Sequence, residues 1–110
     1  MTFAKTASLA ALLLLPVTTA RASSDDAWKQ FAADVKSKCT AALAGQLVKP
    51  KLVVDPTGSE HFGLAIATGE IKGAKSQRAS FVCVYDKVTK MAEIGSELGS
   101  DTLKVTIPGT

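Results

Sequence analysis

Two cysteines, Cys39 and Cys83, limit the folds open to this chain because they lie in segments of different hydrophobic periodicity. Apolar residues around Cys39 recur at helical spacing, whereas those around Cys83 alternate as they do in a strand. A cysteine on the apolar face of a helix can reach a strand beneath it, and an oxidising compartment favours bonding of such a pair. The two cysteines therefore predict a helix joined to a sheet by one disulfide.

The first 22 residues have the parts of a cleavable secretion signal. Lys5 supplies the positive charge, the run Leu9–Leu15 is a short apolar core, and small residues up to Ala22 predict cleavage after that position. The apolar core is too short to span about 30 Å of hydrocarbon. We therefore expect a signal peptide at 1–22, a single mature domain at 23–110, and a soluble product, periplasmic or secreted, without a stable membrane anchor.

Removal of this signal changes the charge balance of the working protein. The whole sequence has 13 basic and 10 acidic residues, but Lys5 and Arg21 leave with the signal, so the mature domain is nearly neutral. The remaining basic residues are scattered and form no stripe for nucleic acid. His61 is the only histidine, which makes a two-cysteine metal site a weak alternative to the disulfide. We expect no metal and no cofactor.

The segment 26–43 is predicted to be the helix. Trp28, Phe31, Val35 and Cys39 recur on one face, acidic residues stand where a helix begins, and Gly45 offers a C-terminal stop. Because Trp28 lies on the apolar stripe, we expect its side chain in the core.

Alternating and apolar runs after this helix predict an antiparallel sheet. Strands are expected at 47–55, 62–68, 77–86 and 90–94, with a turn at 55–58 and loops at 69–76 and 95–100. Pro50 indicates that the first strand is an edge strand or contains a bulge. Leu103, Val105 and Ile107 alternate, so residues 99–110 are either a last strand or a mobile tail.

The strand at 77–86 has one clear inward face. The residues expected on that face are Ala79, Phe81, Cys83 and Tyr85, and those expected on the other are Ser80, Val82 and Val84. The predicted fold is α+β, with one N-terminal amphipathic helix packed on a curved antiparallel meander of four to five strands. A disulfide between Cys39 and Cys83 joins the helix to the sheet.

Catalytic motifs are absent from the sequence. Ser59, Glu60 and His61 are residue types of a hydrolytic triad, but three contiguous residues cannot converge on one reacting atom, and no G-x-S-x-G elbow occurs. The glycines match no phosphate-binding loop or dinucleotide fingerprint. We therefore expect a protein that is not an enzyme. The polar stretches 55–63 and 69–73 flank one strand, and they are either recognition loops or ordinary turns.

The sequence between Gly58 and Gly73 resembles the periplasmic inhibitors of C-type (vertebrate) lysozyme, in particular the short alphaproteobacterial type. The family pattern is S-G-x-x-Y, then seven residues, then W-x-K-G. This chain has the same spacing, with Gly58-Ser59 in reversed order, Phe62 in place of Tyr and Glu70 in place of Trp. The family is typically a β-barrel, from which the helix at 26–43 departs.

The resemblance implies an exported inhibitor that occupies the catalytic cleft of a host C-type lysozyme and so protects peptidoglycan. Ser59 is then the hydroxyl and Lys72 the cation that meet the two catalytic carboxylates, with Phe62 as an apolar anchor and His61 in the same matched segment. Otherwise Lys72 is a loop lysine, Phe62 a core residue and His61 a partly exposed strand residue. The alternative function is a small periplasmic domain that binds another protein or a glycan. A homodimer is compatible with either function.

Overall fold

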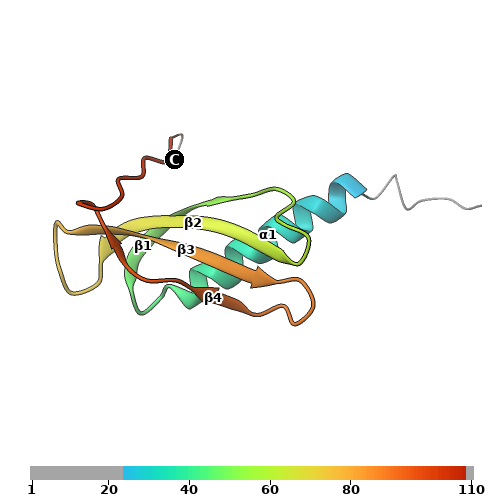
Figure 1. Cartoon of the computed structure of the whole chain (residues 1–110), viewed down its shortest axis with the longest axis horizontal. Helices are drawn as coiled ribbons and strands as arrows, with labels where there is room; N and C mark the ends of the chain where they lie inside the picture. The colour runs from blue at the N-terminus through green and yellow to red at the C-terminus, as the bar shows by residue number, and fades with distance from the viewer. Residues whose placement is uncertain (1–23, 109–110) are drawn as a thin grey trace, which may run out of the picture.

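The computed structural model describes residues 24–108, in which one helix packs against one face of an antiparallel sheet (Figure 1). The predicted signal peptide at 1–22 lies outside the described residues. The α+β prediction is confirmed. The elements are α1 (Ser24–Ala42), β1 (Leu47–Val54), β2 (Phe62–Ile71), β3 (Arg78–Asp86), β4 (Ala92–Ile94) and β5 (Leu98–Gly99).

The helix α1 begins with two acidic residues in its first turn, Asp25 and Asp26, where negative charge favours a helix N-terminus. Its buried face carries Val35 and Cys39, and Leu43, just after its end, is also fully buried. The bounds differ by one or two residues from the predicted 26–43. Trp28 was expected in the core, but its side chain is 43% exposed because the first turns of α1 extend past the sheet.

The sheet is a meander in the order β1-β2-β3-β4, and β5 pairs with the other end of β3. β1 is an edge strand, and its pairing with β2 is interrupted between Val48 and Lys51, around Pro50. Lys49, inside this bulge, has a φ of 46°. Both features predicted from Pro50 are therefore present, because proline cannot donate to a continuous ladder.

Two predicted loops contain strand residues. β2 continues through Gly69, Glu70 and Ile71, which were expected in the loop 69–76. Glu70 pairs with Val48 on one side and Arg78 on the other, so neighbouring strands determine its conformation more than its own weak strand propensity does. The expected loop 95–100 likewise contains β5. Residues 103–108, a candidate last strand, form no ladder.

The core lies between α1 and the inner face of the sheet. The predicted inward face of β3 is confirmed, since Ala79, Phe81, Cys83 and Tyr85 are all at most 3% exposed. Cys39 and Cys83 form the predicted disulfide, with Cα atoms 6.0 Å apart and both side chains fully buried. Gly63 permits the close approach of helix to sheet, because a Cβ there would lie 2.5 Å from the Val35 side chain.

Candidate functional site

The loop between β1 and β2 is held in a fixed shape by its first residue. The Asp55 carboxylate accepts hydrogen bonds from the backbone N–H groups of Thr57, at 3.1 Å, and Gly58, at 2.9 Å. These bonds, the one from Gly58 above all, hold the pKa of the Asp55 carboxyl below its ordinary value. The charged form of Asp55 therefore stabilises the turn at 55–58 that the sequence predicts.

Gly58 and Ser59 close this loop onto the start of β2. Gly58 has a φ of 68°, and a Cβ at this position would lie 2.2 Å from the carbonyl oxygen of Phe62, so only glycine fits. The Ser59 N–H donates to that carbonyl at 2.8 Å. The Ser59 hydroxyl accepts from the Phe62 N–H at 3.2 Å and lies 3.3 Å from the Phe62 carbonyl. The Ser59 side chain is therefore oriented by its own loop.

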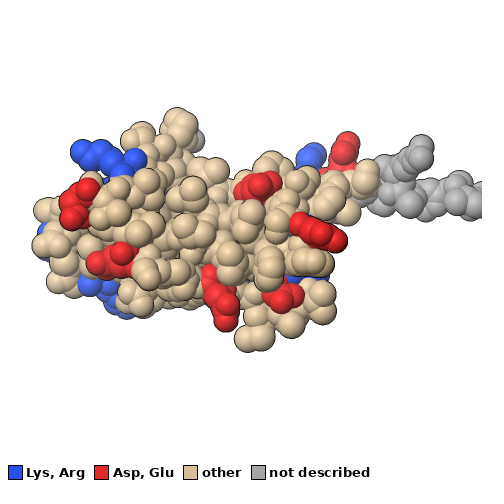
Figure 2. All heavy atoms as spheres, viewed as in Figure 1, with Lys and Arg blue, Asp and Glu red and all other residues tan. Residues whose placement is uncertain are grey.

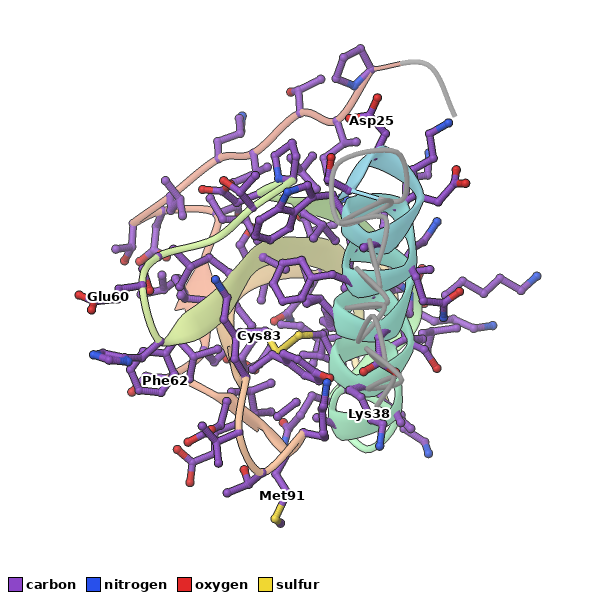
Figure 3. The ribbon with its side chains drawn as sticks, turned by 90° about the vertical axis from the view of Figure 1, so that its right-hand side faces the viewer. Asp25, Lys38, Glu60, Phe62, Cys83 and Met91 are labelled. Carbon is purple, nitrogen blue, oxygen red and sulfur yellow. A yellow bond between two sulfur atoms is a disulfide. The ribbon has the colours of Figure 1, made fainter. Side chains whose placement is uncertain are left out.

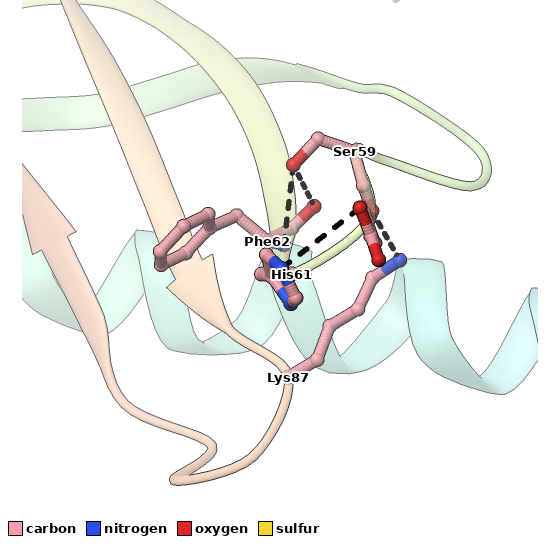
Figure 4. A network of polar contacts seen from close by, with 5 residues as sticks. Ser59, His61, Phe62 and Lys87 are labelled. Carbon is pink, nitrogen blue, oxygen red and sulfur yellow. Dashed lines mark hydrogen bonds and ion pairs between the residues drawn. The ribbon is translucent and has the colours of Figure 1, made fainter.

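Lys87, in the turn after β3, fastens the loop to the body of the protein (Figure 4). Its ammonium group donates to the carbonyl oxygens of Thr57, at 2.9 Å, and Ser59, at 2.6 Å. The same group lies 5.5 Å from the ring centre of Trp28 and 5.1 Å from that of Phe31. Sequence reasoning missed Lys87, because only the fold brings this turn, the loop and the helix together.

The tip of the loop presents three side chains to solvent. Glu60 and His61 are 87% and 73% exposed, and the Glu60 carboxylate lies 3.9 Å from the His61 Nε2 atom. Phe62 is 40% exposed, and Figure 3 shows Glu60 and Phe62 pointing away from α1. A hydroxyl, an imidazole and an aromatic ring, from Ser59, His61 and Phe62, therefore stand on one rigid loop, which we call the 55–62 loop.

A second capped turn supports Lys87. The Asp86 carboxylate accepts hydrogen bonds from the backbone N–H groups of Val88, at 2.8 Å, and Thr89, at 3.0 Å. The bond from Thr89 is the largest cause that lowers the pKa of Asp86, followed by the one from Val88, and His61 acts in the same direction through its charge. In addition, the Lys87 N–H donates to the His61 carbonyl at 3.1 Å. The turn after β3 and the 55–62 loop thus form one bonded unit.

Lys72 lies apart from this unit. Its N–H donates to the Gln46 carbonyl at 2.9 Å, and its ammonium group is 3.5 Å from the Ala44 carbonyl, beyond the C-terminal end of α1. The ten residues of β2 separate Lys72 from Ser59, which at about 3.3 Å per residue is roughly 30 Å. The structure thus brings Ser59, His61 and Phe62 together but leaves Lys72 at the opposite end of the sheet.

Residues 24–108 contain no group of three His, Cys, Asp or Glu side chains that could hold a metal ion. Within the same range, none of the helical structure has both the length and the apolar character needed to cross a membrane. The chain matches no protein-family model, no curated protein and no solved structure.

Proposed function

We propose that this protein is an exported inhibitor of C-type lysozyme, acting in the periplasm or after secretion, and that the 55–62 loop is the segment that enters the catalytic cleft. The rigidity of this loop carries the proposal. Asp55, Gly58 and Lys87 fix its backbone before any partner arrives, so little conformational entropy is lost on binding. The buried disulfide supports export, since such bonds persist in oxidising compartments.

The chemistry of the loop complements a pair of catalytic carboxyl groups. In a glycosidase one carboxyl group is protonated and the other is charged. The Ser59 oxygen already accepts one bond from the Phe62 N–H, and its other lone pair can accept from the protonated acid. His61, when protonated, supplies a cation for the carboxylate from a neighbouring position. Lys87 does not take this role, because its ammonium group is bonded to two loop carbonyls.

A turbidity assay with lysozyme and a bacterial cell-wall suspension tests the proposal. The mature protein should slow lysis at micromolar excess. Ser59→Ala should inhibit at least about tenfold less, as expected when a buried polar group in the cleft loses its partner. Ser96→Ala, at an exposed serine between β4 and β5, is the matched control and should inhibit like the unaltered protein. The proposal fails if the mature protein leaves lysis unchanged at that excess.

An exposed aromatic surface favours a second candidate, a glycan-binding domain. Trp28 is 43% exposed beside Lys87, which holds the 55–62 loop, and Phe62 is 40% exposed on that loop. Aromatic rings with one open face are suited to contact with sugar rings. Sedimentation of the protein with insoluble peptidoglycan, in the absence of lysozyme, tests this function. Binding that Trp28→Ala abolishes would support it, and a protein that stays in the supernatant would exclude it.

A further inference from the structure

The sheet face turned away from α1, which we call the outer face, has apolar side chains at its centre. Val53, Ile66 and Val82 pair across three strands in one row and are 50%, 41% and 44% exposed. Figure 2 shows this face, on which charged side chains lie around the rim and few lie at the centre. In an antiparallel sheet with one solvated face, the outward positions are ordinarily polar. A continuous apolar row is therefore typical of a contact surface.

The C-terminal segment covers one half of the outer face. Leu103, Lys104 and Val105 line a hollow together with Thr68 and Ser80 of the sheet. This cover explains why Thr68 and Ser80 are only 4% and 1% exposed, although Ser80 was expected on the face away from the core. The segment 103–105 therefore forms a ridge on the outer face, on the side of the row that leads to the β2–β3 turn.

The other half of the outer face contains a groove of about 440 Å³. Its walls include Val53, Pro56, Leu64, Ile66 and Val82, and they are mostly apolar. Leu64 precedes Ile66 by two residues and Thr68 follows it by two, so the groove and the ridge lie on opposite sides of the row. One face thus carries both a ridge and a hollow of apolar character.

We propose that the outer face binds a second copy of this chain, with a two-fold axis that runs across the strands at the row of Val53, Ile66 and Val82. Rotation about this axis exchanges positions equally far before and after the row, so Thr68 of one copy faces Leu64 of the other. The ridge of each copy then lies in the groove of the other, and the contact is isologous. Leu103, which is 38% exposed on the ridge, provides its apolar contact.

Charge complementarity favours a second copy over an unrelated apolar partner. Lys104 on the ridge is exposed, and the rotation turns it toward the row that contains Leu64, Val84 and Glu93. Glu93 is exposed at the edge of that row. Two Lys104–Glu93 pairs, one at each end of the interface, would then fix the register of the two copies.

The size of the face determines how strong this dimer is. The four strands β1 to β4 are about 4.8 Å apart and give a face roughly 19 Å wide. The nine residues of β3, at about 3.3 Å each, make it roughly 30 Å long, so the face covers roughly 570 Å². Such an area is below the roughly 800 Å² per partner of a standard interface. We therefore expect a dimer that forms and dissociates with concentration in the micromolar range.

Sedimentation velocity between about 1 and 300 µM protein tests the dimer, since weak interfaces associate in this range. The mass should rise from that of one chain to that of two. Ile66→Asp should lower the association constant at least about tenfold, because it places a charge in the centre of the interface. Val88→Asp is the control, since Val88 is 85% exposed in the turn after β3 and lies off the outer face. Near-ultraviolet circular dichroism shows whether each variant is folded.

A charge exchange tests the two-fold arrangement itself. Lys104→Glu and Glu93→Lys should each weaken association severalfold, and the double variant should restore it. The proposal is overturned if the unaltered protein stays monomeric at the highest concentration, or if folded Ile66→Asp associates as strongly as the unaltered protein. A folded double variant that associates no better than the single variants also overturns it.

Discussion

The hydroxyl of Tyr85 donates a hydrogen bond to the carboxylate of Asp34 and so joins β3 to α1 in the same part of the core as the disulfide. Tyr85 is only 1% exposed, and burial raises the pKa of its phenol to about 12, with the bond to Asp34 acting in the same direction. A phenolate at this position would be both desolvated and next to a carboxylate. The fold therefore favours the neutral form of Tyr85.

We predict that stability falls in alkaline solution because of Tyr85. Its pKa is raised from 10.0 in the unfolded chain to about 12, so its contribution is complete below pH 10 and is lost as the pH rises toward 12. The loss should be on the order of 2 kcal/mol of unfolding free energy. Urea unfolding at a series of pH values measures it. Tyr85→Phe should be less stable at neutral pH and should show a much smaller alkaline decline.

The 55–62 loop should loosen in acid. The pKa values of Asp55 and Asp86 are lowered from 3.8 by backbone hydrogen bonds, so their contribution to stability is present above that pH and is lost as the pH falls below it. Melting temperatures between pH 5 and pH 2 should therefore decline, and less steeply in Asp55→Ala. Asp55→Asn keeps an oxygen that accepts the same bonds and serves as the control. An identical acid decline in Asp55→Ala would contradict this role.

Gly58→Ala should disrupt the loop. The added Cβ meets the Phe62 carbonyl at 2.2 Å and stands on a residue whose φ is 68°, so we expect a loss of roughly 1–3 kcal/mol in unfolding free energy. Inhibition of lysozyme should weaken with it. Gly73→Ala is the matched control, because Gly73 has a φ of 84° but nothing within 4 Å of the added atom. Equal losses of unfolding free energy in the two variants would show that the positive φ, and not the contact of the added Cβ with the Phe62 carbonyl, destabilises Gly58→Ala.

Lys87→Met should free the 55–62 loop while the core remains intact. Methionine keeps an unbranched side chain at this position but removes the two bonds to loop carbonyls and the charge that lies over the Trp28 and Phe31 rings, at a cost of about 1 kcal/mol at this partly exposed position. Hydrogen exchange should become faster at the Ser59 and Phe62 amides. Lys75→Met, at an exposed position in the β2–β3 turn, is the control. Unchanged exchange at both amides would mean that Asp55 and Gly58 hold the loop without Lys87.

Loss of the disulfide should weaken the whole fold. The bond closes a loop with a sequence separation of 44, which corresponds to about 4 kcal/mol in the chain-entropy description. In a domain of this size the melting temperature should fall by well over 10 °C. The measurement is thermal unfolding of the double variant Cys39→Ala, Cys83→Ala, with and without reductant. Only the unaltered protein should respond to reductant.

The elements with clear periodicity could be predicted from the sequence. The apolar stripe through Val35 and Cys39 was sufficient to predict the helix, and the alternation around Cys83 was sufficient to predict the inward face of β3. Together they predicted the disulfide, because the local pattern and the burial in the fold agree at these positions. Pro50 indicated an edge strand or a bulge, and the structure contains both. In contrast, Gly69 and Glu70 have weak strand propensity, and only pairing with the neighbouring strands makes them part of β2.

The candidate site could be predicted only in part. Ser59, His61 and Phe62 are neighbours in the chain and remain neighbours in space, but Lys72 is held away from them by the extended strand between them. The continuous apolar run at 62–68 was the signal for that separation. Lys87 had no such signal, because its importance depends on Trp28 and the 55–62 loop, which are far away in the sequence.

The bulge in β1 hinders the assembly of many copies of this chain into fibrils. An exposed edge strand is a template onto which another chain can add a strand, and repeated addition builds cross-β polymers. Here Pro50 offers no N–H, and Lys49 turns the backbone out of the strand conformation, so an incoming strand finds an interrupted ladder. The opposite side of the sheet ends in β4 and β5, with three residues and two. Neither edge therefore offers a long template for open-ended polymerisation.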